Sequence, residues 1–293
     1  MPISQKFQLL LSRIQPSEEQ HSARMAQAKQ IENCLKNHIS LHSTRIIGSH
    51  SRGSAIYPYS DIDLMAIFHR KDAVWGGSYV ASTTALEWVR KTLISRYPTT
   101  EIGKDKQAIV VGFKNGHVDV VPAIFEGMKM VGQINRPMFR IPDGFGDWMK
   151  TAPEVHSVYI ESAHKLSGYK FTRCLQLLKY WRECRVPKVP LSSFHLELVL
   201  ASAGVFNQIA TYQTCLHEAF KLLLRRECRA LQDPMGISGN VKACATEAQR
   251  ESAQNAIAYA VDKASRALIA EQGGYSKDAR DYWNLVFNGH FPG

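Results

Sequence analysis

The 293-residue sequence lacks the patterns that mark several common protein classes. Its six cysteines include no CxxC motif and no adjacent pair, which excludes a zinc ribbon and a thioredoxin-type dithiol and indicates free thiols in a reducing compartment. Nowhere do about 18 apolar residues follow one another, as a membrane-spanning helix requires. A short apolar patch at residues 7–11 has no cleavage site behind it. We therefore expect a cytoplasmic protein that has no contact with a membrane.

The composition excludes disorder of the whole chain. Hydrophobic residues make up 45% of the sequence and charged residues 21%, so there are enough apolar side chains to form a core. A chain of this length folds either as one large domain or as two moderate domains that share a cleft.

Basic residues outnumber acidic ones. The chain has 36 Lys and Arg against 26 Asp and Glu, a formal net charge of +10, and the surplus is spread over both halves. Nucleotides, RNA and DNA are all polyanions that such a chain can attract. A basic protein without a polyanionic ligand fits the charge equally well.

Apolar spacing indicates a mixed first part and a helical second part. In the first part we expect helices at 18–39 and 84–97 and strands at 43–48, 60–68, 107–113 and 117–125. The Asn115–Gly116 turn predicts that the last two strands form an antiparallel hairpin. Residues 128–150 contain prolines and glycines and indicate strands or loops. The helices expected in the second part are 154–167, 170–184, 192–207, 211–230, 240–271 and 276–287.

Two acidic residues alternate in the expected strand at 60–68. Asp61 and Asp63 share one face of a strand, while Ile62 and Leu64 point to a core on the other face. Two carboxylates side by side repel each other unless cations lie between them. Hard oxygen ligands of this kind suit Mg²⁺ or Mn²⁺.

A third carboxylate, Asp119, lies inside an otherwise apolar strand, where an unpaired charge is costly to bury. If this strand lies beside the Asp61 strand, the three acids can bind two divalent ions. Such a pair of ions stabilises the attacking and leaving oxygens of an in-line phosphoryl transfer. The alternative is that Asp119 forms a structural ion pair with a Lys or Arg.

A glycine and a serine precede the paired acids. Gly48 permits a tight turn after a strand, and Ser49 with the amides that follow can bind a phosphate group. Asp61 is the twelfth residue after Ser49. This spacing makes the Gly-Ser pair more specific than a bare dipeptide.

The segments GSHSRGSAIYPYSDIDL (48–64) and VDVVPA (118–123) resemble the DNA polymerase β-like nucleotidyltransferase superfamily, and more closely its CD-NTase enzymes, the bacterial relatives of cyclic GMP-AMP synthase and oligoadenylate synthase. LLKYW (177–181) and LSSFHLE (191–197) are similar to later motifs of the same family. By position, the resemblance implies that Lys179 contacts phosphates, Ser193 hydrogen-bonds the nucleotide and Phe194 stacks on a base. The other readings are a solvated lysine, a helix N-cap formed by Ser192 or Ser193, and a core phenylalanine.

The resemblance also implies a fold and an activity. The fold is α/β: a mixed-sheet nucleotidyltransferase core at 1–155 with an early helix spanning both lobes, an all-helical lobe at 156–293, and an active site in the cleft between them. The activity is synthesis of cyclic di- or oligonucleotide second messengers from nucleoside triphosphates, with ATP or GTP or both as substrates and UTP as a further candidate. Two Mg²⁺ or Mn²⁺ ions are the cofactors, and the product activates a downstream effector in anti-phage signalling.

Nucleic acid is not required, because the His and clustered cysteines of the animal DNA sensor's zinc thumb are absent. Two rival functions fit the same core. One is a terminal nucleotidyltransferase that acts on RNA, and the other is an inactive relative that only binds nucleotides. Base choice, ring size and linkage are fixed by no motif in the sequence.

Overall fold

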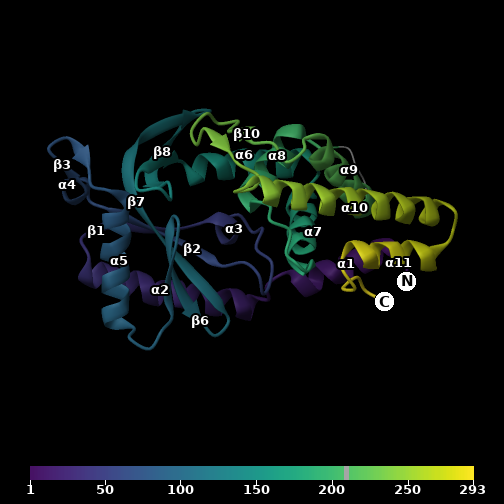
Figure 1. The fold of residues 1–293 in the computed structure, drawn as a ribbon, viewed down its shortest axis with the longest axis horizontal. Coiled ribbons are helices and arrows are strands. Elements are labelled where there is room, and N and C mark those ends of the chain that lie inside the picture. The colour runs from purple at the N-terminus through teal and green to yellow at the C-terminus, as the bar shows by residue number, and fades with distance from the viewer. Residues whose placement is uncertain (208–210) are drawn as a thin grey trace. The chain divides into compact units, whose positions relative to one another are not determined.

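The computed structural model describes residues 1–207 and 211–293, and its contacts divide the chain into two units (Figure 1). The sheet unit is Pro16–Val158, and the helical unit combines Met1–Gln15 with Tyr159–Gly293. The predicted mixed core and helical second part therefore correspond to the two units. The first fifteen residues differ from the prediction, because they belong to the helical unit and not to the core. None of the helices in the described ranges has the length and hydropathy to span a membrane.

A mixed sheet forms the centre of the sheet unit. Its strand order is β1-β2-β7-β6-β5, and β8 pairs with β7 and β9. The central pair, β2 and β7, is parallel, whereas β1–β2, β6–β7, β5–β6, β7–β8 and β8–β9 are antiparallel. The predicted hairpin at 107–125 is confirmed as β6 and β7. The strands are β1 (Leu41–Ile47), β2 (Ile62–Phe68), β5 (Ile102–Asp105), β6 (Ala108–Phe113), β7 (Gly116–Val131), β8 (Ile134–Pro142) and β9 (Trp148–Thr151).

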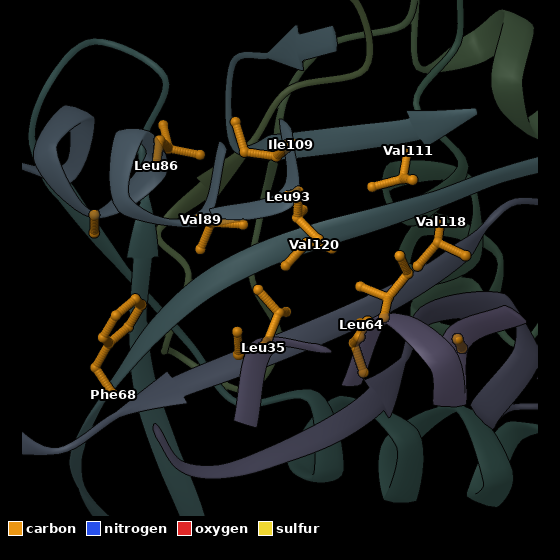
Figure 2. Close-up of a cluster of buried hydrophobic side chains, with 14 of the residues drawn as sticks. Leu35, Leu64, Phe68, Leu86, Val89, Leu93, Ile109, Val111, Val118 and Val120 are labelled. Carbon is orange, nitrogen blue, oxygen red and sulfur yellow. The ribbon is translucent and has the colours of Figure 1, made fainter. Parts of the chain in front are cut away.

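Helices α2 (Glu18–His38) and α5 (Ser82–Arg96) pack on one face of this sheet and close its core (Figure 2). Every second residue of β2 enters that core, and α2 supplies Ala28, Ile31 and Leu35 at helical spacing. Strand β7 contributes Val118, Val120 and Ile124. Ser17 begins α2 with a capping box. Both predicted helices are confirmed within two residues at their ends. However, α2 lies wholly in the sheet unit, whereas the sequence predicted a helix spanning both lobes.

Shorter elements complete the sheet unit. Residues 128–150, left open as strands or loops, form the end of β7 and the strands β8 and β9, with Gly132 at positive φ in the intervening turn. The remaining elements are α3 (Gly48–Ser51), α4 (Arg70–Ala73), β3 (Val74–Trp75), β4 (Ser78–Tyr79) and the start of α6 (Pro153–Leu166).

The helical unit packs its first helix against its last residues. The ring centroid of Phe7 in α1 (Ile3–Ile14) lies 5.0 Å from that of Trp283 and 4.8 Å from that of Phe291. Helix α1 was not among the helices predicted from the sequence. The other helices are α7 (Phe171–Cys184), α8 (Ser193–Ala203), α9 (Tyr212–Arg225), α10 (Glu247–Gln272) and α11 (Ser276–Val286).

One predicted helix begins later than expected. The sequence predicted a helix at 240–271, but α10 starts at Glu247 with Thr246 as its N-cap. The residues before it form a small hairpin of β10 (Leu231–Gln232) and β11 (Asn240–Val241). Its turn is held by the buried Asp233, whose carboxylate accepts backbone N–H groups of Met235, Ile237 and Ser238.

Candidate active site

The alternation of β2 separates its acidic residues from its apolar ones. Ile62 and Leu64 are buried in the core against α2 and α5. Met65 and Ile67 pack on the opposite side of the sheet, in a second, smaller cluster. Asp61 and Asp63 precede Met65 at two-residue spacing, so their side chains share this second face.

The third aspartate lies directly beside them. In the parallel pair of β2 and β7, Asp63 and Asp119 are register partners, and paired residues in a sheet project to the same side. Val118 and Val120 of β7 enter the core, which leaves Asp119 on the opposite face. The structure therefore brings Asp61, Asp63 and Asp119 together at the start of two adjacent strands.

Asp61 is held by hydrogen bonds and charges of the protein. Its Oδ1 accepts the backbone N–H of His117 at 2.9 Å and lies 3.4 Å from the guanidinium of Arg24. The imidazole Nδ1 of His117 is also 3.4 Å from the same oxygen. The side chain of Asp61 remains 37% exposed, so it is held by protein donors and still accessible to solvent.

Asp119 is half-buried, and one of its oxygens is buried without a partner. Within the described part of the chain, its Oδ1 has no hydrogen bond. Burial and the negative charge of Asp61 raise the pKa of Asp119 to about 6, against a smaller opposing effect of His117. The structural ion pair that the sequence left open would have lowered this pKa. An unpartnered carboxylate beside two others is the arrangement expected of a cation site.

Gly48 allows the backbone to approach Asp63 closely. Its φ is +69°, and a Cβ atom added to it would lie 1.9 Å from Oδ2 of Asp63. No other residue type fits this position without displacing the carboxylate. The sequence indicated a tight turn at Gly48, and the structure adds that the turn makes room for Asp63.

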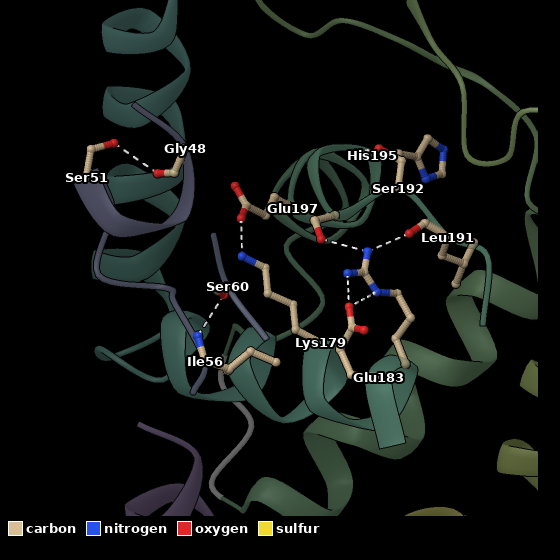
Figure 3. Close-up of polar contacts among 12 residues, drawn as sticks. Gly48, Ser51, Ile56, Ser60, Lys179, Glu183, Leu191, Ser192, His195 and Glu197 are labelled. Carbon is tan, nitrogen blue, oxygen red and sulfur yellow. Dashed lines mark hydrogen bonds and ion pairs between the residues drawn. The ribbon is translucent and has the colours of Figure 1, made fainter. Parts of the chain in front are cut away.

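Ser49 lies in the single turn of α3 that follows. Its carbonyl accepts the N–H of Ser54, and Ser51 Oγ donates to the carbonyl of Gly48 (Figure 3). Further along, the N–H of Ile56 donates to Ser60 Oγ at 2.9 Å. These local bonds shape the segment between Ser49 and Asp61 into a compact loop.

The chemistry of the three carboxylates fits divalent cations. All are hard oxygen donors, and one carries a buried oxygen in need of a partner. Across residues 1–207 and 211–293, however, no three His, Cys, Asp or Glu side chains already stand in an ion-binding arrangement. Binding would therefore require the carboxylates to turn toward the ion.

The predicted nucleotide contacts of the helical unit have partners inside that unit. Lys179 in α7 forms an ion pair with Glu197 of α8 at 2.6 Å, and both side chains are almost fully buried (Figure 3). Ser193 Oγ accepts from Arg182 at 2.7 Å. Phe194 is half-buried at the start of α8. Ser192 is the N-cap of α8, as one reading of this pair predicted.

Sequence reasoning missed three residues of these sites: Arg24, His117 and Glu197. Arg24 lies four residues before Ala28, on the apolar stripe of α2, and a charged residue on a buried stripe was the available signal. His117 acts through its backbone N–H, which no sequence pattern reports. Glu197 follows the Ser-Ser-Phe segment and is the one acidic residue of α8, whose sequence is mostly apolar.

Comparisons with known proteins identify the family of the chain. Residues 1–163 match the family model of the Second Messenger Oligonucleotide or Dinucleotide Synthetase domain. A protein of Bacillus cereus (strain VD146), named a probable cyclic nucleotide synthase, is 22% identical over 276 residues, which cover 84% of this chain and 81% of that protein.

Solved structures share the fold. The Escherichia coli MS115-1 CdnC structure with ATP matches with a TM-score of 0.75 and 20% identity over 99% of both chains. The Bradyrhizobium diazoefficiens CD-NTase CdnG in complex with GTP matches with a TM-score of 0.69 and 10% identity over 98% of both chains. At these identities the likeness establishes the fold.

Proposed function

Since the chain belongs to the family of second messenger oligonucleotide or dinucleotide synthetases, we propose that it joins nucleoside triphosphates into cyclic products with Asp61, Asp63 and Asp119 as ligands of two divalent ions. Membership confirms the family and the enzyme class, a nucleotidyltransferase, that the sequence predicted. The observation that carries the site assignment is the register pair of Asp63 and Asp119, with an unpartnered oxygen on Asp119.

We assign a role to each candidate site residue of the sheet unit. Asp61, Asp63 and Asp119 would hold the two Mg²⁺ or Mn²⁺ ions. Ions bound there would supply charge to activate the acceptor hydroxyl and to offset the negative charge of the departing pyrophosphate. Gly48 keeps the backbone close to Asp63, and Ser49 donates its hydroxyl to a phosphate. In the helical unit, Lys179, Ser193 and Phe194 are the proposed contacts to phosphate, nucleotide and base.

The proposed substrates are ATP or GTP or both, with UTP as a further candidate. Structures of the same fold contain ATP or GTP, which supports nucleoside triphosphates as the substrate class. We place the reaction in the cytoplasm, where these triphosphates are made. The product would activate a downstream effector protein in a response to phage infection.

Product analysis tests the activity. Pure protein is incubated with labelled ATP, GTP, CTP and UTP and with Mg²⁺ or Mn²⁺, treated with phosphatase, and chromatographed. Small products that resist phosphatase support cyclisation. Products that require added RNA would favour a terminal transferase, and nucleotide binding without turnover would favour an inactive relative.

Three variants test the metal ligands. Asp61→Ala and Asp63→Ala are expected to abolish product formation and leave the circular dichroism spectrum unchanged, because both side chains lie outside the core cluster. Asp262→Ala, an exposed aspartate on α10, is the matched control and should retain full activity. Turnover at the wild-type rate in either of the first two variants would refute the assignment.

A further inference from the structure

Arg24 is a buried arginine whose guanidinium joins three segments of the sheet unit. It lies on α2 and is only 5% exposed. One nitrogen, Nη1, donates to the carbonyl of Asn115 at 2.9 Å, and Nη2 donates to the carbonyl of Ser60 at the same distance. Nη2 also lies 3.4 Å from Oδ1 of Asp61. A single side chain thus ties a helix to the residues just before β2 and to the turn before β7.

The turn before β7 is built around this guanidinium. Gly116 has a φ of +124°, and a Cβ atom there would lie 2.2 Å from Nη1 of Arg24. The next residue, His117, donates its backbone N–H to Oδ1 of Asp61. Arg24 therefore acts on the Asp61 carboxylate in two ways. It contacts the carboxylate directly, and it fixes the turn whose His117 N–H donates to the same carboxylate.

The contacts that Asp61 itself makes all reach one of its two oxygens. Among the described residues, the hydrogen bonds and ion pairs of Asp61 end on Oδ1. With Oδ1 engaged, the orientation of the carboxylate is fixed and Oδ2 is the oxygen presented to an ion. When a residue that hydrogen-bonds to a metal ligand and orients it is removed, the affinity for the metal commonly falls by about 10–100-fold.

We propose that Arg24 is a positioning residue for the divalent ions, setting the orientation of Asp61 through its fork of hydrogen bonds. The proposal rests on the proposed function, because it takes Asp61 as a metal ligand. Charge alone does not explain the residue, since a cation beside a metal site opposes ion binding. Two of the three contacts of the Arg24 guanidinium go to neutral carbonyl groups, which indicates that Arg24 acts by fixing the geometry of the site. A lysine keeps the charge but cannot reproduce the planar fork.

The test measures binding of Mn²⁺ itself, by the electron paramagnetic resonance signal of unbound Mn²⁺, to the full chain without nucleotide. Arg24→Lys and Arg24→Met are each expected to raise the dissociation constant for Mn²⁺ about tenfold. Lys29→Met, on the same helix with a 62% exposed side chain, is the control and should bind as the wild type does. Gly116→Ala leaves Arg24 in the sequence but displaces its guanidinium. This variant should show the same loss of Mn²⁺ affinity, and it provides the test if the Arg24 variants fail to fold.

The outcomes separate this proposal from the proposed function. Wild-type affinity in Arg24→Lys, or tighter binding in Arg24→Met, would overturn the positioning role, the latter because it would make Arg24 a competing cation. Asp61→Asn is measured alongside. If Asp61→Asn binds Mn²⁺ as well as the wild type does, the ligand assignment of Asp61 fails. If Asp61→Asn loses binding and Arg24→Lys does not, the positioning role alone fails.

Discussion

Replacing Gly48 by alanine should damage the site far more than it damages the fold. An L side chain in the left-handed region costs about 1–2 kcal/mol. The new Cβ would also lie 1.9 Å from Oδ2 of Asp63, and real Cβ contacts stay beyond 3.0 Å, so the carboxylate has to move by about 1 Å. A displacement of that size in a reacting assembly costs about 100-fold in rate, or about 2.7 kcal/mol of transition-state stabilisation.

The chain contains a matched control for this substitution. Gly53 has nearly the same φ, +65°, and nothing lies within 4 Å of its added Cβ. Gly53→Ala and Gly48→Ala should lower Tm by a similar few degrees. Only Gly48→Ala should lose product formation, measured from labelled triphosphates at saturating Mg²⁺. Equal activities of the two variants would show that the position of Asp63 does not matter, and the three-carboxylate site would be refuted.

Three further predictions concern charged groups. Asp119→Asn should abolish activity but raise the free energy of unfolding in urea with EDTA by about 1–3 kcal/mol, because it removes a partly desolvated charge that Asp61 repels; a loss of stability would contradict this. Hydrogen bonds from Arg140 hold the pKa of Glu126 at about 2. A lowered carboxyl pKa stabilises the fold above about pH 4.5, so at pH 7 the free energy of unfolding of the wild type should exceed that of Glu126→Gln by about 1–2 kcal/mol. This difference should shrink as the pH falls from about 4.5 toward 2. A difference that does not depend on pH would count against the ion pair of Glu126 with Arg140. Lys179→Met should cost about 3–5 kcal/mol of unfolding free energy, most of it regained in the double variant with Glu197→Leu; a cost below about 1 kcal/mol would exclude a buried ion pair.

The common orientation of Asp61 and Asp63 was predictable because side chains alternate between the two faces of a strand. Two-residue alternation places Asp61 and Asp63 on one face whatever the rest of the fold does. The hairpin turn at Asn115–Gly116 then sets the position of Asp119 along β7. What the sequence did not establish was that β2 and β7 are neighbours, and the register between them had to come from the structure.

Arg24 and Glu197 were not predictable from local pattern. Arg24 bonds to a carbonyl 91 residues away in the chain, and nothing near it in sequence indicates that partner. Glu197 looks like a solvent-exposed residue of α8 until Lys179 is found beside it on α7. In both cases the charged group is buried only because a distant segment supplies its counterpart.

Helix α1 was not predicted, and strand β8 was left open as strand or loop, for a similar reason, since each depends on partners that its own sequence does not indicate. Helix α1 does carry an apolar stripe, Ile3, Phe7, Leu10 and Ile14, but it is twelve residues long and interrupted by polar side chains. Its partners are the aromatic residues at the other end of the chain. In β8, Pro137 and Pro142 weigh against a strand, and pairing with β7 on one side and β9 on the other compensates for them.

The packing of Phe7 against Trp283 and Phe291 has a consequence for biosynthesis. Residues 16–158 are contiguous, so they can fold while the ribosome is still translating the rest. Helix α1 is translated before them and has to wait for α7, α9 and α11, which all emerge later. The nascent chain therefore carries an apolar helix without its partners through much of translation, and a premature stop codon just before residue 283 would remove the aromatic side chains that cover Phe7 while α7 and α9 remain.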